Sequence, residues 1–307
     1  MRWLMLAAAL AGCGTLGYYV RATFVDDPFE RVAVEETVLA EPMPEGVRSF
    51  AVSTPERYEA VVSPGRSMAD AQNVKSVSKV LLASVVGELG LDLDAPIQTI
   101  SGCDVPGRLS LRMLLNMEAG FAYRENADNH VFRAENWTCR ILALPLAVEH
   151  GQRFNYGTVQ SHLVSAHLHD RGVDVPRAIE ALGFDVARWV ESPEGAMFGG
   201  SELWVSPAAL HRFGERVVRG EVAQAHWRSV QATPGPYALG WWRRDYAGAT
   251  ALVAEGFGGQ VLALFDDGMV VSATSPTGGD VEARLAVVRE MIVCARRGGT
   301  AVDCATP

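Results

Sequence analysis

The order of strand-like and helix-like segments is what most constrains the fold of this 307-residue chain. β-Rich runs lie near both ends, and helix-like segments joined by glycine- and proline-rich loops lie between them. Strands at the two ends imply one sheet that is completed by segments far apart in the sequence. We therefore predict an α+β fold, in which an antiparallel sheet is flanked by helices and a helical subdomain is inserted at about 100–235. The strand-like runs are RSFAVS and RYEAVVS near the start, and YALGWWRR, TALVAE, QVLALFDD and MVVSATS near the end.

The first twenty residues form a segment of a different kind. Arg2 is followed by an apolar run from Trp3 to Val20, which is typical of an export signal or a membrane anchor. Residues 10–13, Leu-Ala-Gly-Cys, resemble the lipobox of bacterial lipoproteins, in which Cys13 would receive the lipid. An uncleaved anchor helix over 3–20 is the alternative. Both place the rest of the chain on the periplasmic side of a bacterial envelope, tethered to the membrane.

The rest of the chain has the composition of an ordinary globular domain. Residues 21–45 mix charges with three prolines, so we expect a tether with one short helix there, before a folded domain over 46–307. A net charge of −9 without a basic run argues against nucleic acid as a partner and favours a small-molecule or peptide-like substrate. The seven histidines are scattered, and neither CxxC nor HExxH occurs, so we predict no metal site.

Four cysteines lie beyond the apolar segment, and in an exported chain they could pair. Cys294 and Cys304 are close in sequence, so we expect a disulfide between them, which leaves Cys103 to pair with Cys139. Buried free thiols are the alternative.

The heptapeptide VKSVSKV contains the only two lysines of the chain, Lys75 and Lys79, among 27 lysines and arginines. A lysine that is kept against such a bias suggests a task that arginine cannot perform. One such task is giving up a proton, because arginine stays protonated in proteins, whereas a buried lysine can act as a base.

Ser76 supplies a group that such a base could activate. Ser76 and Lys79 are three residues apart at the start of a helix-like segment, which places both side chains on one face. A serine hydroxyl is a weak nucleophile until a neighbouring base takes its proton. Lys75 would point away from Lys79, and we interpret it as a solvated or hydrogen-bonded neighbour without a catalytic role.

Residues 76–79 resemble the Ser-x-x-Lys motif of the serine β-lactamase and penicillin-binding protein superfamily. The resemblance covers about residues 46–296 and is closest to the class C-like branch, which includes esterases and 6-aminohexanoate-oligomer hydrolases. It implies a β-lactamase/transpeptidase-like fold and a serine hydrolase that needs no cofactor. The other segments that carry it, in order, are LDLDAPI, LSLRMLLNMEAGF, HGQRFNYGT, SELWVSPAALHRFG, YALGWWRR and AEGFGGQ.

The resemblance also implies roles for single residues. Ser76 would be the nucleophile and Lys79 its base, and Tyr156 would match the tyrosine that helps to carry protons to the leaving group. Taken alone, Tyr156 would be read as a core tyrosine. The backbone N–H groups of Ser76 and Phe257 would form the oxyanion hole. The family's third motif corresponds to Ala254, Glu255 and Gly256. Gly256, with Gly258 and Gly259 in the turn after it, would let substrate approach the backbone, although a plain hairpin turn explains Gly258 and Gly259 equally.

Two motifs depart from the family pattern. Thr158 replaces an asparagine that would contact substrate, and Ala254 and Glu255 replace the cationic and hydroxyl residues that hold a β-lactam carboxylate. Glu255 would repel such a carboxylate unless it points to the other face of the sheet. We therefore predict weak or no β-lactamase activity and a substrate that is neutral or cationic near the scissile bond. Alternation along a strand also implies that only one of Trp241 and Trp242 faces the cleft.

The sequence thus predicts a serine hydrolase that cleaves an amide or ester bond through a Ser76 acyl-enzyme. The alternative is a catalytically inactive module of the same fold that binds cell-wall fragments or a partner protein. Lys79 favours the enzyme, because a binding module could have exchanged it for arginine. A transpeptidase is less favoured, since the cation that would receive a peptide carboxylate is missing.

Overall fold

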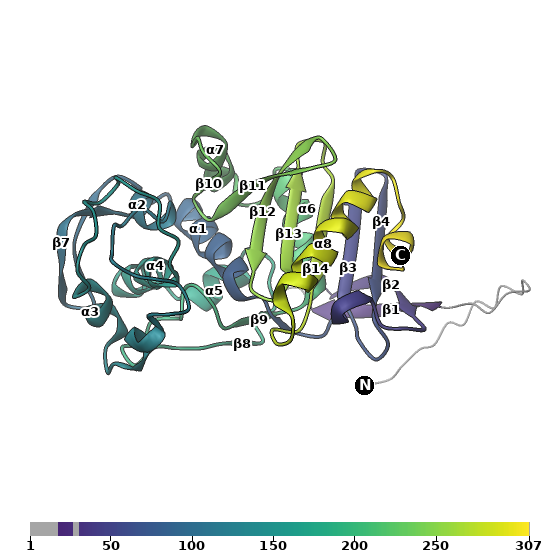
Figure 1. The fold of residues 1–307 in the computed structure, drawn as a ribbon, viewed down its shortest axis with the longest axis horizontal. Helices are drawn as coiled ribbons and strands as arrows, with labels where there is room; N and C mark the ends of the chain where they lie inside the picture. Colours follow the sequence, from purple (N-terminus) through teal and green to yellow (C-terminus); the bar gives the residue numbers. More distant parts are fainter. Residues whose placement is uncertain (1–17, 27–30, 307) are drawn as a thin grey trace, which may run out of the picture.

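The computed structural model describes residues 18–26 and 31–306. In this part of the chain, nine strands form one central sheet (Figure 1). Neighbouring strands are antiparallel, except that the second and third in the order are parallel. The predicted α+β class is confirmed. From edge to edge the strands are β1 (Tyr18–Asp26), β2 (Arg31–Leu39), β4 (Arg57–Val62), β3 (Ser49–Thr54), β14 (Val270–Thr274), β13 (Gln260–Phe265), β12 (Ala249–Gly256), β11 (Trp241–Tyr246) and β10 (Tyr237–Ala238).

The predicted signal or anchor, Cys13 included, lies outside the described residues except for its last three positions. Residues 18–20 begin β1, so a helix that extends to residue 20 is wrong at these positions. Among the residues that the structure describes, no helix is both long and apolar enough to cross a membrane.

The prediction of a tether over 21–45 is wrong, because this segment supplies most of β1 and all of β2. Val34 and Val38 of β2 are buried, with the even spacing of a strand that packs one of its faces. Glu36 lies between them and is buried too, and its carboxylate accepts a hydrogen bond from the backbone N–H of Met68 at 2.6 Å. The carboxylate of Glu36 therefore takes part in a buried hydrogen bond. Composition alone does not distinguish such a buried charge from a charge in a solvated tether.

Helices cover both faces of the sheet (Figure 1). On one face lie α8 (Val281–Arg296) and α9 (Ala301–Ala305), and on the other α6 (Pro207–Val218) packs against β13 and β14. A Cβ at Gly214 of α6 would lie 2.8 Å from a side-chain carbon of Val270, so a glycine is needed for this close approach. The predicted insertion at about 100–235 therefore ends too late, because α6 belongs to the sheet layer.

The lobe before α6 contains short helices, as predicted, but also strands that the sequence did not indicate. Helix α3 (Trp137–Leu142) ends shortly before Pro145, which cannot continue a helix. The remaining elements are η1 (Pro44–Gly46), β5 (Gln72–Asn73), η2 (Lys75–Val77), α1 (Ser78–Glu88), β6 (Pro96–Ile100), β7 (Cys103–Ser110), α2 (Leu111–Leu115), η3 (Asn129–Arg133), α3 (Trp137–Leu142), α4 (Thr158–Asp170), α5 (Val175–Glu180), β8 (Arg188–Trp189), β9 (Leu203–Val205) and α7 (Gln224–Ala232).

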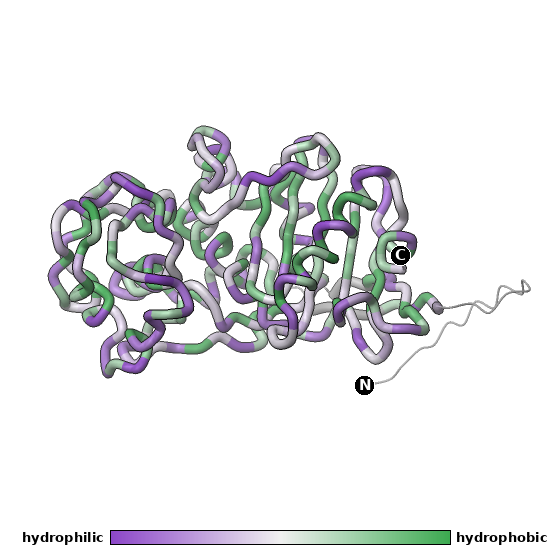
Figure 2. Tube along the Cα trace, in the orientation of Figure 1, coloured by the Kyte–Doolittle hydropathy of each residue, from purple (hydrophilic) through white to green (hydrophobic). Residues whose placement is uncertain are grey.

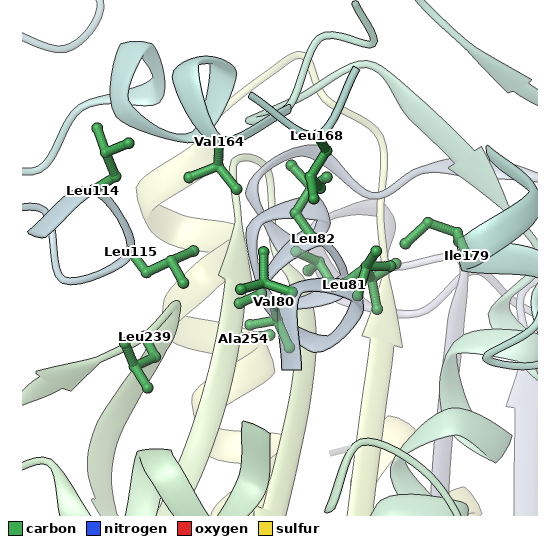
Figure 3. Close-up of a cluster of buried hydrophobic side chains, with 14 of the residues drawn as sticks. Val80, Leu81, Leu82, Leu114, Leu115, Val164, Leu168, Ile179, Leu239 and Ala254 are labelled. Atoms are coloured by element: carbon green, nitrogen blue, oxygen red, sulfur yellow. The ribbon is translucent and has the colours of Figure 1, made fainter. Parts of the chain in front are cut away.

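Helix α1 joins the sheet to this lobe. Val80, Leu81 and Leu82 are fully buried, and side chains from α2, α4, α5 and β12 surround them (Figure 3). A helix that is buried on most sides has to be largely apolar, as the sequence of α1 is between Val80 and Val86. Figure 2 shows hydrophobic residues concentrated along the central strands, and every residue of β13 is buried. Residues 76–79 thus begin an element that is fixed from both sides.

Both predicted disulfides are confirmed. Cys103 and Cys139 join β7 to α3, and Cys294 and Cys304 join α8 to α9. Each bridge ties a short element to a neighbour within its own layer.

Two histidines are fully enclosed at helix contacts. On α6, His211 Nδ1 lies 2.9 Å from Ser272 Oγ and Nε2 lies 2.9 Å from Ser53 Oγ, which links the helix to β14 and β3. On α7, His226 accepts a hydrogen bond of 3.1 Å from the indole N–H of Trp241. Burial lowers the pKa of His211 to about 3 and that of His226 to about 3. Both side chains are therefore neutral in the folded protein near pH 7.

We predict that the protein loses stability on acidification below about pH 6.5. In that range histidine binds a proton in the unfolded chain, whereas His211 and His226 stay unprotonated in the folded protein. Each histidine contributes a loss of up to about 1.4 kcal/mol per pH unit between that value and its folded pKa. Urea unfolding at pH 7.0 and 5.0 measures the loss. The variants His211→Gln and His226→Gln should each show a smaller difference between the two pH values than the wild type, and equal differences would contradict the assignment.

Candidate active site

Ser76 and Lys79 meet at the junction of η2 and α1. Lys79 Nζ donates a hydrogen bond to Ser76 Oγ at 2.8 Å. Ser76 is half-buried, whereas Lys79 is only 2% exposed. The helical spacing of three brings the two groups onto one face, as predicted. A partly exposed hydroxyl therefore lies in contact with an amine that is shielded from water.

Two further acceptors complete the surroundings of the amine. Lys79 Nζ donates to the backbone carbonyl of Gly200 at 2.9 Å and to Thr158 Oγ1 at 3.2 Å. An ammonium group has three protons, and Ser76, Thr158 and Gly200 match them in number. In its ammonium form the amine would thus have an acceptor for each of its protons.

Gly200 was not identified from the sequence, although it sits in a Gly-Gly doublet directly before the segment SELWVSPAALHRFG. A Cβ at Gly200 would lie 2.5 Å from the Cγ2 methyl of Thr158 and 3.2 Å from Lys79 Nζ. A side chain at this position would therefore displace the very carbonyl that binds the lysine.

Tyr156 lies beside the same amine. Lys79 Nζ is 5.0 Å from the centre of the Tyr156 ring, within the range of a cation–π contact. The neighbouring residue fixes this loop, because the side-chain amide of Asn155 donates to the carbonyls of Phe121 at 3.1 Å and Tyr123 at 2.9 Å. The structure thus brings Tyr156 to Lys79, as the motif resemblance implied.

Aromatic rings extend outward from Tyr156. Its ring stacks on that of Trp242 with centres 5.8 Å apart, and Tyr237 and Phe154 contact Trp242 at 4.7 and 5.8 Å. Phe154 is 42% exposed, so the cluster reaches the surface. Trp241, next in the strand, is 1% exposed and belongs to the core. Only one of the two tryptophans lies beside the site, as alternation predicted.

The third motif turns its glutamate away from Ser76. Glu255 of β12 forms ion pairs with Arg244 at 3.3 Å and with Arg289 of α8 at 3.2 Å. Its side chain therefore lies on the sheet face that α8 covers. Ala254 points to the opposite face and packs near Val80 (Figure 3). Of the two orientations that the sequence allowed for Glu255, the structure has the one away from the cleft, so Glu255 is not placed to bind substrate there.

The end of β12 touches the loop that carries the serine. A Cβ at Gly256 would lie 2.4 Å from the carbonyl oxygen of Val74, two residues before Ser76. Phe257 follows at the hairpin tip and is 51% exposed. Gly258 and Gly259 have φ of +89° and +85°, so the turn itself requires glycine at both positions.

Lys75 is a hydrogen-bonded neighbour, as interpreted from the sequence. Its ammonium pairs with Glu202, which also accepts from the amide of Asn73 at 2.9 Å. Burial pushes the pKa of Glu202 up, but the hydrogen bond and positive charge of Lys75 outweigh it, so the net pKa is lower than usual. The pair anchors the η2 turn to the residues that follow Gly200.

Comparison with known proteins yields structural relatives only. The chain matches no protein-family model and no curated protein. A D-amino acid amidase from Ochrobactrum anthropi SV3 superposes with a TM-score of 0.64 at 16% identity, covering 83% of this chain and 95% of that one. A β-lactamase from Mycobacterium bovis gives 0.60 at 19% identity, covering 83% and 96%. A penicillin-binding protein from Bacillus halodurans gives 0.63 at 14%, covering 78% and 94%.

The fold is that of the serine β-lactamases and transpeptidases. Within this β-lactamase/transpeptidase fold, Thr158 stands where the motif resemblance implied asparagine, and its hydroxyl is the group that contacts Lys79. Its backbone N–H and hydroxyl donate to the two carboxylate oxygens of Glu125 at 2.7 and 2.5 Å. Glu125 was missed in the sequence because it lies 33 residues from Thr158, in a loop without a recognisable motif.

We predict that Gly200→Ala lowers ester turnover by about tenfold or more, because the added methyl group displaces the carbonyl that holds Lys79. The matched control is Gly278→Ala, where a Cβ would meet no atom within 4 Å. Initial rates on p-nitrophenyl acetate, with thermal unfolding measured in parallel, provide the test. If Gly200→Ala retained wild-type rates, the carbonyl contact would have no role in activity.

Proposed function

We propose that the protein is a serine hydrolase that cleaves an amide or ester bond through an acyl-enzyme on Ser76. The single observation that carries the proposal is the 2.8 Å contact between Ser76 Oγ and the buried amine of Lys79. The fold supports it, since the amidase and the β-lactamase named above share the same architecture. The expectation that the chain acts on the periplasmic side of a membrane remains part of the proposal, and two disulfides support an oxidising compartment.

In the acylation step, Ser76 Oγ bonds to the substrate carbonyl carbon while its proton passes to Lys79 Nζ. The carbonyl oxygen takes up the negative charge, and the backbone N–H groups of Ser76 and Phe257 would stabilise it. The bond to the leaving group then breaks, and that group receives the proton from Lys79 with Tyr156 as relay. Water attacks the acyl ester in the second half, which releases the acid and returns the proton to Ser76 Oγ.

The substrate is best matched by an uncharged molecule with an apolar group. The rings of Tyr156, Trp242 and Phe154 offer such a group a surface beside the amine. Ala254 supplies no cation for a carboxylate, and Arg244, which lies 4.3 Å over the Trp242 ring, is already paired with Glu255. We therefore propose weak or absent β-lactamase activity.

Hydrolysis of p-nitrophenyl acetate, followed with a stopped-flow burst, tests the reaction class. If deacylation is slower than acylation, we expect a burst of p-nitrophenol equal to the enzyme concentration. Otherwise we expect steady turnover without a burst. Ser76→Ala should abolish both. The matched control is Ser78→Ala, which removes a buried hydroxyl that has no hydrogen-bond partner among the described residues and should leave turnover within about twofold. A Ser76→Ala variant as active as the wild type would refute the proposal.

The aromatic surface predicts a selective effect at Trp242. Trp242→Leu should raise the KM for a p-nitrophenyl phenylacetate by about tenfold, because a ring–ring contact and its buried area are lost. The KM for the acetate should change by less than about twofold, which makes the acetate an internal control. Equal changes for the two esters would show that the acyl group does not lie on this surface.

A further inference from the structure

We infer that Glu125 is a positioning residue that acts through Thr158 to direct the lone pair of Lys79 at Ser76. The inference rests on the proposed function, because it concerns how the base is aimed. It starts from the two hydrogen bonds between Glu125 and Thr158, of 2.7 Å from the backbone N–H and 2.5 Å from the hydroxyl.

The hydroxyl proton of Thr158 points to Glu125. An ionised carboxylate accepts hydrogen bonds and donates none. Because Glu125 Oε1 accepts from Thr158 Oγ1, the proton of that hydroxyl is committed to the carboxylate. The second carboxylate oxygen is held by the backbone N–H, a donor that cannot turn. Thr158 Oγ1 can therefore only accept from Lys79 Nζ, which lies 3.2 Å away.

A neutral Lys79 can form only a limited set of hydrogen bonds. A neutral amine has two N–H groups and one lone pair, whereas the ammonium has three N–H groups. The carbonyl of Gly200, at 2.9 Å, can only accept, and so can Thr158 for the reason just given. These two acceptors take the two N–H groups. The lone pair is then left for Ser76, the one partner of the three whose hydroxyl proton is free to be given up.

Without the carboxylate, this direction would be lost. The Thr158 hydroxyl could rotate and donate to the lone pair of Lys79, in competition with Ser76. For part of the time the lone pair of Lys79 would then accept a hydrogen bond from Thr158 and would not be available to Ser76. The proton transfer itself is unchanged: the Ser76 O–H bond breaks, an N–H bond forms on Lys79, and Oγ bonds to the substrate carbonyl carbon.

A simpler role for Glu125 is to cap α4. Thr158 is the first residue of that helix, and the N-cap residue, Gly157, has no side chain that could accept a hydrogen bond. A carboxylate at a helix N-terminus is stabilising in any case. A cap affects stability, however, and does not depend on the hydroxyl of Thr158. The two roles therefore differ in how Glu125 and Thr158 couple in catalysis.

The experiment is a double-mutant cycle of Glu125→Gln and Thr158→Val, with kcat and KM for p-nitrophenyl acetate and thermal unfolding measured on each variant. Glutamine keeps an acceptor for the backbone N–H, and valine keeps the shape of threonine without its hydroxyl. We expect Glu125→Gln to lower kcat by about tenfold with KM within about twofold. In the Thr158→Val background the same change should alter kcat by less than about twofold. Thr158→Ser, which retains the hydroxyl, should keep kcat within about threefold of the wild type.

Asp174→Ala is the matched control. Asp174 caps α5 by accepting from the backbone N–H of Arg177 at 3.1 Å, without any contact to the site residues. It should reduce stability and leave kcat unchanged. The positioning role would be wrong if Glu125→Gln lowered kcat by the same factor in the wild type and in Thr158→Val, or did not lower it in the wild type. The hydrolase proposal would still stand. A wild type without Ser76-dependent turnover would overturn both.

Discussion

The burial of one amine organises this site. Lys79 Nζ is removed from water, and such a group is tolerated only where it finds hydrogen-bond partners. Those partners come from three places in the sequence: the turn before α1, the first turn of α4, and the carbonyl of Gly200. The requirement to satisfy a single polar group thus holds the sheet layer and the helical lobe in one arrangement, with Ser76 at their junction.

Close backbone packing keeps that arrangement rigid. At Gly87, a Cβ would lie 2.8 Å from the Cβ of His226, which locks α1 against α7. At Gly240, it would lie 3.3 Å from the Cα of Val80, so the β10–β11 turn rests directly on α1. A helix held this closely at two points along its length has little freedom to shift. Lys79, which lies next to Val80 at the start of α1, is therefore presented to Ser76 in a fixed geometry.

Features that depend on the local sequence pattern were predicted correctly. Features that depend on contacts between residues far apart in the sequence were not. Ser76 and Lys79 share a helical face because of their spacing, and β3, β4 and β11 to β14 were visible as β-rich runs near the two ends of the sequence. The segment with β2 was misassigned, because Glu36 looks solvated until its buried partner is known. Glu125 could not be found at all, since only the tertiary fold brings it to Thr158. The orientation of Glu255 likewise depended on Arg289, a residue of another layer.

The central claim is that Lys79 is present because it can accept a proton from Ser76. Intact-mass analysis after exposure to a fluorophosphonate tests it most directly on the wild type, Ser76→Ala, Lys79→Arg and the matched Lys75→Arg. The account predicts one covalent adduct on the wild type and on Lys75→Arg, and none on the other two variants, because arginine does not release a proton at accessible pH. Labelling of Lys79→Arg at the wild-type rate, or a folded wild type that stays unlabelled, would contradict it.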